Sequence, residues 1–262
     1  MTSRRTPIPV LLALALALAG CGGVAAARQT VSTAAKAPKP PRVGKARSCR
    51  AGSFHRLGSA RAAYAAVAQR PLRVYRRPGS RPFARLGLVN MNGVRTVLGV
   101  TGAVVGPACR ATWYRVQVPM RPNGSTGWVH AFAVWVAQVR TRIEVDVSDR
   151  RLTFYRGGRR VLVARTAVGS SATPTPIGRF YVNQKLIPSN PSGPFGPGAI
   201  GISAFSNVLT GWTQGGPVAI HGTNAPWSIG RAVSNGCIRV PNPVLRRLFR
   251  AAPTGTPVIV HP

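Results

Sequence analysis

From Arg70 to the C-terminus, the apolar residues of this chain fall in short runs with a period of two, separated by turns that contain glycine and proline. Leu72–Arg76, Trp113–Val118 and Ile143–Val147 are examples. A period of two places alternate side chains on one face of a strand, whereas an amphipathic helix needs a period of about 3.6. The chain is therefore predicted to be mainly β, with one or two short helices.

Two segments carry helix signals. The alanine-rich stretch Ser59–Gln69 favours a short helix by composition, and Pro243–Ala251 places apolar residues at helical spacing between arginines.

A proline- and glycine-rich stretch, Pro188–Gly201, has neither the strand pattern nor the helix pattern. Long irregular loops are uncommon in compact domains and often border binding clefts, so we expect this loop to lie beside a site.

The N-terminus predicts export. Two arginines at positions 4 and 5 precede the apolar run Val10–Ala19, which is too short to span a bilayer comfortably and is typical of a secretory signal. The run ends in the tetrapeptide Leu-Ala-Gly-Cys, which resembles the lipobox of bacterial lipoproteins and implies acyl chains on Cys21. An ordinary signal cleaved near residues 25–27 is the alternative reading.

These features predict the order of the parts along the chain. Residues 1–20 would be the signal peptide, and a lipid on Cys21 would hold the protein at the outer face of the bacterial cytoplasmic membrane. Residues 21–48 have no apolar period and are predicted to form a disordered tether. Two β-rich units would follow, over residues 49–138 and 141–261.

The cysteines are expected to have three different roles. Export places Cys49 and Cys109 in a compartment where disulfides persist, so we expect these two to pair. Cys21 is assigned to the lipid. Cys237 is then left unpaired, and an unpaired cysteine in an exported protein requires a separate explanation.

The charge balance excludes several kinds of site. The chain has 36 Lys and Arg residues against three Asp and Glu, for a net charge of +33. Paired catalytic carboxylates and a carboxylate cage for calcium or magnesium are therefore improbable, and the four histidines show no metal-ligand spacing, so no metal or cofactor is expected. The charge favours an anionic partner such as a wall polymer, although a compositional bias without a ligand would give the same excess. Export argues against nucleic acid.

A histidine and a cysteine stand close together in the sequence within characteristic surroundings. His221 follows an apolar strand and precedes a glycine, and Cys237 follows Gly236. A catalytic thiol needs a base or cation to hold it as a thiolate, and a glycine before it lets a substrate carbonyl approach the backbone. His221 and Gly236 can supply these two functions.

The surrounding residues extend this pair into a long motif. The segments IHGTNAPWSIG and SNGCIR, with VGSSATPTPIGRFYV and the GPFGPGAIGIS loop before them, resemble the L,D-transpeptidases with a YkuD-type catalytic domain. The resemblance covers about residues 141–260 and implies a β-sandwich or barrel. Many members have a histidine where this chain has Asn235, which is given no catalytic role. The stretch WYRVQVPMRPNGSTGWV resembles a bacterial SH3-like module, a small β-barrel, and the first unit is expected to be one.

The resemblance implies a mechanism. Cys237 is the nucleophile and His221 the general base that holds it as a thiolate. The sulfur attacks a peptidoglycan stem peptide and releases a terminal D-amino acid, and an amine from a second stem then resolves the thioester to form a cross-link between third residues. Backbone N–H groups at Gly236 and Cys237 are the expected oxyanion donors, and Arg239 is expected to bind a substrate carboxylate.

Three further residues are assigned near the site. Ser234 and Asn224 offer polar groups to the substrate, although a turn or cap role would suit each as well. Because no Asp or Glu lies within 70 residues of His221 in the sequence, we expect the backbone carbonyl of Gly222 to orient the imidazole.

Alternatives stay open. An L,D-carboxypeptidase, with water as the acceptor, would use the same residues. A lipid-tethered wall-binding protein whose catalytic motif is idle would bind through its basic surface. A sortase is not supported, because the chain has no Thr-Leu-x-Thr-Cys segment, and NlpC/P60-type peptidases place cysteine before histidine in the chain.

Overall fold

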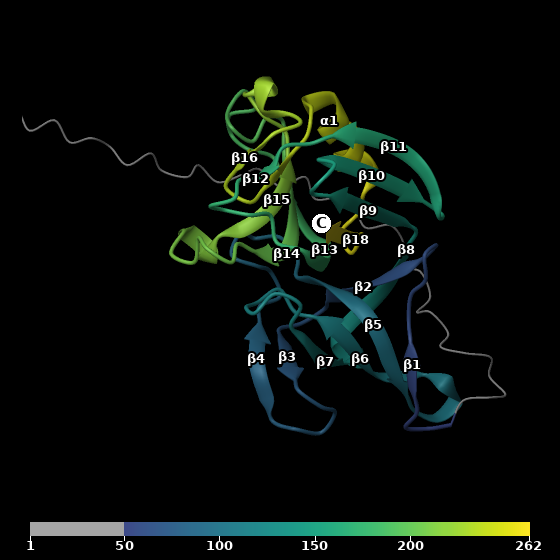
Figure 1. Cartoon of the computed structure of the whole chain (residues 1–262). Helices are drawn as coiled ribbons and strands as arrows, with labels where there is room; N and C mark the ends of the chain where they lie inside the picture. The colour runs from purple at the N-terminus through teal and green to yellow at the C-terminus, as the bar shows by residue number, and fades with distance from the viewer. Residues whose placement is uncertain (1–49) are drawn as a thin grey trace, which may run out of the picture.

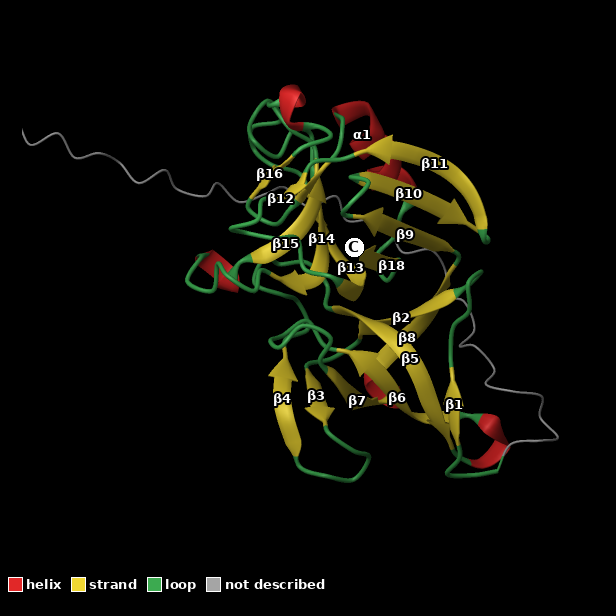
Figure 2. Cartoon of the chain, viewed as in Figure 1, coloured by secondary structure: helices red, strands yellow, loops and turns green. Residues whose placement is uncertain are grey.

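The computed structural model describes residues 50–262, which form two β units that follow one another along the chain (Figure 1). The predicted signal peptide, Cys21, the tether and Cys49 lie outside the described residues. The described part is mainly β with one α-helix, which confirms the predicted fold class (Figure 2). No helix among residues 50–262 is long and apolar enough to cross a membrane.

The first unit is one sheet with strand order β4-β3-β7-β6-β5-β2-β8, and β1 pairs with β5. Every pairing within this sheet is antiparallel. Its strands are β1 (Phe54–Arg56), β2 (Ala63–Ala68), β3 (Leu72–Tyr75), β4 (Pro82–Leu86), β5 (Val97–Val105), β6 (Ala111–Gln117), β7 (Thr126–His130) and β8 (Val134–Val139).

The predicted helix over Ser59–Gln69 is wrong. Residues 63–68 form strand β2, which is hydrogen-bonded to β5 on one side and to β8 on the other. Alanine favours helices in isolation, but tertiary pairing overrides a weak local preference. Ala65, Ala66 and Ala68 are buried, and their small side chains suit a strand enclosed between two neighbours.

The second unit is an eight-stranded sheet with the order β11-β10-β9-β18-β13-β14-β15-β17. Its strands are β9 (Thr141–Asp146), β10 (Arg151–Arg156), β11 (Arg159–Arg165), β13 (Gly178–Leu186), β14 (Ala199–Phe205), β15 (Pro217–His221), β17 (Ile238–Arg239) and β18 (Pro257–His261). A separate parallel pair joins β12 (Val168–Gly169) and β16 (Ala232–Ser234). The single α-helix, α1 (Asn242–Ala251), begins one residue before the predicted Pro243.

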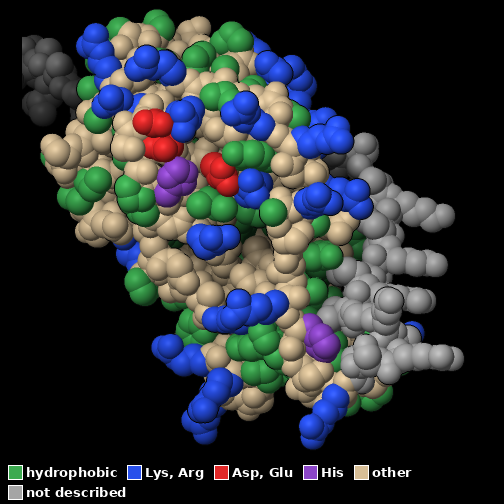
Figure 3. Space-filling model, turned by 45° about the vertical axis from the view of Figure 1, so that its right-hand side comes forward, with side chains coloured by type: hydrophobic (Ala, Val, Ile, Leu, Met, Phe, Trp, Pro, Cys, Tyr) green, Lys and Arg blue, Asp and Glu red, His purple; other side chains and the backbone are tan. Residues whose placement is uncertain are grey.

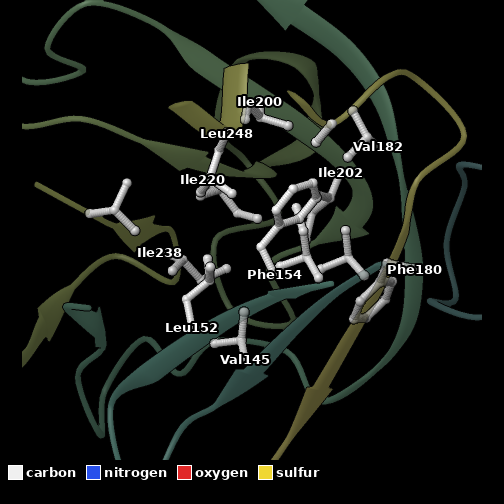
Figure 4. Packing of buried hydrophobic residues seen from close by; sticks show 14 of the residues in the cluster. Val145, Leu152, Phe154, Phe180, Val182, Ile200, Ile202, Ile220, Ile238 and Leu248 are labelled. Atoms are coloured by element: carbon white, nitrogen blue, oxygen red, sulfur yellow. The ribbon is translucent and has the colours of Figure 1, made fainter. Parts of the chain in front are cut away.

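The core of the second unit holds β15 and β17, the strands beside which His221 and Cys237 lie. Ile220 on β15 and Ile238 on β17 are fully buried, and they pack in one cluster with Phe154, Ile200 and Leu248 (Figure 4). Burial of this much apolar surface is the main force that holds β15 and β17 in place. The end of β15, at His221, and the start of β17, directly after Cys237, are therefore held in place on the sheet.

Polar side chains join the two units. The Asn123 side chain donates to the carbonyl oxygen of Phe205 at 2.7 Å and accepts from the Phe205 N–H at 2.9 Å. Gln184, which is buried, accepts hydrogen bonds from Asn90 and Asn92 of the first unit. Because each of these polar groups has a partner, the contact between the units is hydrogen-bonded as well as packed.

Candidate active site

His221 and Cys237 come together through the pairing of two short strands. β15 and β17 are parallel, with Ile220 opposite Ile238 and His221 opposite Arg239. Since the two isoleucines face the core, alternation along the strands turns His221 and Arg239 to the opposite face. Cys237 directly precedes β17, and a backbone hydrogen bond from Ala219 of β15 reaches its sulfur.

The imidazole of His221 is buried and has a defined hydrogen-bond partner. Its Nδ1 lies 2.6 Å from the carbonyl oxygen of Gly222, and the Phe195 ring packs against it with a centroid separation of 4.9 Å. Burial, with a smaller contribution from the positive charge of Arg239, lowers the pKa of His221 to about 4, although the Gly222 carbonyl acts in the opposite direction. The imidazole is therefore neutral at pH 7. Because a carbonyl oxygen can only accept, Nδ1 carries the hydrogen and the Nε2 lone pair is left as a base.

Cys237 carries a free thiol, and the residue as a whole is partly exposed. Burial of the sulfur raises its pKa, and the hydrogen bond from Ala219 and the charge of Arg239 offset this only in part. The thiol is therefore protonated at neutral pH. Burial disfavours the charged form of both groups, so these pKa shifts favour a neutral thiol and a neutral imidazole over the expected thiolate.

Ser234 lies inside the loop that carries the cysteine. Its hydroxyl is buried and donates to the carbonyl oxygen of Cys237 at 2.6 Å, while it accepts from the N–H of Gly236 at 3.1 Å. The backbone carbonyl of Ser234 in turn accepts from the hydroxyl of Thr173 at 3.0 Å. The polar atoms of Ser234 hold the 234–237 loop in shape, which is the turn role given above as the alternative to a substrate contact.

The same hydrogen bond revises the assignment of Gly236. Its N–H points to the Ser234 hydroxyl and so is not free to stabilise an oxyanion. Gly236 has a φ of +101°, a conformation that favours glycine, and this accounts for the residue type at that position. The N–H of Cys237 itself is left as the backbone donor beside the sulfur.

No carboxylate lies at the site. The three acidic residues of the chain form ion pairs elsewhere: Glu144 with Arg142, and Asp146 and Asp149 with Arg151. Figure 3 shows the acidic side chains gathered in one small area of a surface dotted with basic ones. The guanidinium of Arg239 is half-buried and has no carboxylate partner among residues 50–262.

Sequence reasoning missed two residues that shape the histidine turn. The side-chain oxygen of Asn242, at the start of α1, accepts a hydrogen bond of 2.8 Å from the N–H of Thr223. Phe195 comes from the predicted irregular loop and is 47% exposed while it covers the imidazole. Two sequence signals could have indicated these residues: Phe195 is an aromatic in a loop of glycine and proline, and Asn242 is a polar residue at the start of a helix. Asn224, assigned to substrate binding, is exposed just beyond this turn.

The remaining assigned residues lie away from the site or outside the described part. Cys109 is disulfide-bonded, whereas Cys237 is free. Cys49, its expected partner, and Cys21, the expected lipid site, are not among the described residues. Within residues 50–262, no three His, Cys, Asp or Glu side chains are grouped as metal ligands would be.

Comparison with known proteins identifies the second unit. Residues 140–260 match the family model for the YkuD L,D-transpeptidase catalytic domain. The chain is 40% identical over 121 residues to a putative L,D-transpeptidase YkuD of Bacillus licheniformis, covering 46% of this chain and 66% of that protein. The match to the Bacillus subtilis protein of the same name is 38% identical over 119 residues, with 45% and 65% covered.

The chain thus spans just under two thirds of the length of these two relatives. A crystal structure of a mutant L,D-transpeptidase of Enterococcus faecium is 30% identical, covers 46% of this chain and 49% of that chain, and has a TM-score of 0.35. Residues 140–260 of this chain form an L,D-transpeptidase catalytic domain of the YkuD family.

Proposed function

We propose that this protein is an L,D-transpeptidase that forms cross-links between the third residues of two peptidoglycan stem peptides. His221 Nε2 takes the proton of the Cys237 thiol as the sulfur attacks the carbonyl carbon of the third stem residue. The bond to the terminal D-amino acid breaks, and that residue leaves with the proton from His221. An amine of a second stem then displaces the sulfur, and its proton returns through His221 to the thiol.

One observation carries this proposal: a neutral His221, held through Nδ1 by the Gly222 carbonyl, lies on the strand next to Cys237. The pKa of about 4 keeps the base form populated at the pH of the reaction. The raised pKa of the thiol means that the proton moves during the attack, as it does when a base activates a protonated nucleophile.

The neighbouring groups fit the charge changes of this reaction. The Cys237 N–H lies beside the sulfur and would stabilise the oxyanion of the tetrahedral intermediate. Arg239 has an uncompensated positive charge that lowers the pKa of both reacting groups, so it would favour the transient thiolate and attract a substrate carboxylate. Asn224, exposed beyond the histidine turn, is proposed to contact the stem peptide.

The surroundings of the catalytic domain are part of the proposal. Residues 1–20 would be removed on export, Cys21 would carry the lipid anchor at the outer face of the cytoplasmic membrane, and residues 21–48 would be the tether. Cys109, which is disulfide-bonded, would pair with Cys49. The first sheet, within residues 49–138, would be an SH3-like module, and the excess of arginine would favour anionic wall polymers as partners.

The experiment is incubation of the mature protein with purified tetrapeptide stems, followed by mass spectrometry. We expect an acyl-enzyme on Cys237, release of the terminal D-amino acid and a cross-linked dimer, all abolished by Cys237→Ala. Tripeptide without dimer would identify an L,D-carboxypeptidase, in which water is the acceptor. The absence of any adduct on Cys237, with stems or with a carbapenem, would show an idle site and refute the proposal.

A further inference from the structure

A cavity lies in the catalytic domain between the β10–β11 hairpin and α1. Its volume is about 330 Å³, and it is lined by Phe154, Arg156, Val161, Leu162, Arg247, Leu248, Arg250 and Ala251. Its lining comes from β10, β11 and the C-terminal half of α1, and it includes neither His221 nor Cys237. Figure 1 shows α1 beside β10 and β11. The volume is within the range of small-molecule sites.

The rim of this cavity is positively charged without compensation. Arg156, Arg247 and Arg250 are all exposed, and all three carboxylates of the chain pair with Arg142, Arg151 or His261 instead. Three guanidinium groups around one opening repel each other and attract an anion. Arginine also binds phosphate oxygens through two parallel N–H groups, which makes a phosphate the best-matched anion.

The floor of the cavity is apolar. Phe154, Leu162 and Leu248 belong to the core and are 2%, 8% and 0% exposed, whereas Val161 on the same wall is 46% exposed. A plain anion would leave the exposed side chain of Val161 in contact with water, because the other three are already almost fully buried. A ligand that covers Val161 with hydrocarbon gains about 25 cal/mol for each Å² removed from water. The cavity therefore suits an anion that is covalently joined to an apolar chain.

We propose that this cavity binds the anionic head of a membrane phospholipid, with the arginines on the phosphate and the start of the acyl chains against Val161 and the apolar floor. The outer leaflet of a bacterial membrane supplies such lipids where the protein is proposed to be anchored, and basic surface residues are attracted to it. A second contact with the membrane would add to the lipid on Cys21 and set the orientation of the catalytic domain. The inference does not use the chemistry at Cys237.

The test is calorimetric titration of the chain from residue 21 onward, with Cys21→Ser so that no lipid is attached. Three soluble probes separate charge from apolar contact: dihexanoyl phosphatidylglycerol, dihexanoyl phosphatidylcholine and glycerol 3-phosphate. We expect phosphatidylglycerol to bind at least roughly tenfold more tightly than the other two, since only it combines a net negative charge with acyl chains. Equal affinity for glycerol 3-phosphate would identify a site for a phosphate polymer and overturn the proposal.

Two pairs of variants localise the binding. Arg247→Gln should weaken the binding of phosphatidylglycerol roughly tenfold, whereas Arg246→Gln, an exposed arginine of the same helix outside the cavity, should not. Val161→Ser should weaken it roughly fourfold, and Val163→Ser, 49% exposed on the same strand, should leave it unchanged.

The outcomes are decisive in either direction. An equal loss in Arg246→Gln and Arg247→Gln would show attraction to the general positive charge of the protein and would overturn the proposed site. Absence of phosphatidylglycerol binding would overturn it as well. Acylation of Cys237 by a carbapenem, measured on every variant, should stay at the level of the unsubstituted chain, which separates this proposal from the proposed transpeptidase activity.

Discussion

Nδ1 of His221 lies 2.6 Å from the carbonyl oxygen of Gly222, the residue that follows it in the chain. This contact places the hydrogen on Nδ1 and leaves Nε2 as the only nitrogen that can take a proton. No carboxylate is needed to orient the ring, which suits a protein with three acidic residues. Burial, rather than a charged partner, sets the pKa of this base.

We expect the thiol of Cys237 to be protonated at pH 7, because burial raises its pKa. The ultraviolet absorbance of a thiolate should appear only when the pH is raised above the pKa range that is ordinary for thiols. In His221→Gln this titration should be nearly unchanged, while acylation by a carbapenem falls by roughly 10²–10⁴. A thiolate signal at pH 7 that disappears in His221→Gln would instead show an ion pair at rest.

His221 should also make the stability of the folded protein depend on pH. Its pKa is about 4 in the folded state against an ordinary 6.5, so between these values the unfolded chain binds a proton that the folded protein does not. The contribution of His221 to the free energy of unfolding should therefore be fully present above about pH 6.5. It should fall by about 3 kcal/mol as the pH drops toward 4.

Denaturant titrations at several pH values measure this dependence. Burial lowers the pKa of His130 in the same direction, so the contribution of His221 is the difference between the unsubstituted protein and His221→Gln. The same slope in both proteins between pH 4 and 6.5 would show that His221 is not buried as a neutral group.

Sequence reasoning placed the reacting residues but not the shape of the loop between them. The strand before His221 and the glycine before Cys237 were visible as local patterns. The direction of the Gly236 N–H was not, because it depends on the Ser234 side chain turning inward. The sequence leaves Ser234 open between a substrate contact and a turn role, since a polar residue beside a nucleophile has the same pattern whether it faces out or in.

The ionisation state and the β2 strand were missed for related reasons. Burial of His221 and Cys237 arises from segments far away in sequence, among them the loop that contributes Phe195, so the pKa values could not be inferred from the motif. The alanines of β2 favour a helix until β5 and β8 offer hydrogen bonds on both sides. Regular alternation predicted β3, β6 and β9, whereas the stretch expected as an irregular loop, Pro188–Gly201, ends inside β14.

Ser234→Ala should damage the loop and leave substrate affinity nearly unchanged. The variant removes the donor to the Cys237 carbonyl and the acceptor of the Gly236 N–H, two buried hydrogen bonds. We expect a loss of about 2 kcal/mol in the free energy of unfolding and a fall in kcat with little change in KM. A raised KM with unchanged kcat would restore the substrate contact expected from sequence.

The three carboxylates should be dispensable for the chemistry. Glu144 pairs with Arg142 of β9. Asp146, and Asp149 of the turn after β9, pair with Arg151 of β10. Conversion of each to its amide should leave the rate of Cys237 acylation within about twofold of the unsubstituted protein. A loss comparable to that of Cys237→Ala in any one of them would show that a carboxylate assists the imidazole.

Gly222 should tolerate no side chain, and Asn242 should be the main reason. A Cβ at Gly222 would overlap the side-chain oxygen of Asn242 and would lie 2.8 Å from Cδ of Pro197. Gly222→Ala should therefore cost about 2 kcal/mol of stability and displace the carbonyl that holds His221. Asn242→Ala should cost about 1 kcal/mol through the lost hydrogen bond to Thr223.

The double variant distinguishes steric overlap from a general effect on the turn. Removal of the Asn242 side chain relieves the largest overlap, so Gly222→Ala with Asn242→Ala should be more stable than the sum of the single losses predicts, by about 1 kcal/mol. Acylation of Cys237 should recover in part, since the Gly222 carbonyl can return toward Nδ1 of His221. Strict additivity in both measurements would place the cause of the loss at Pro197 or in the backbone itself.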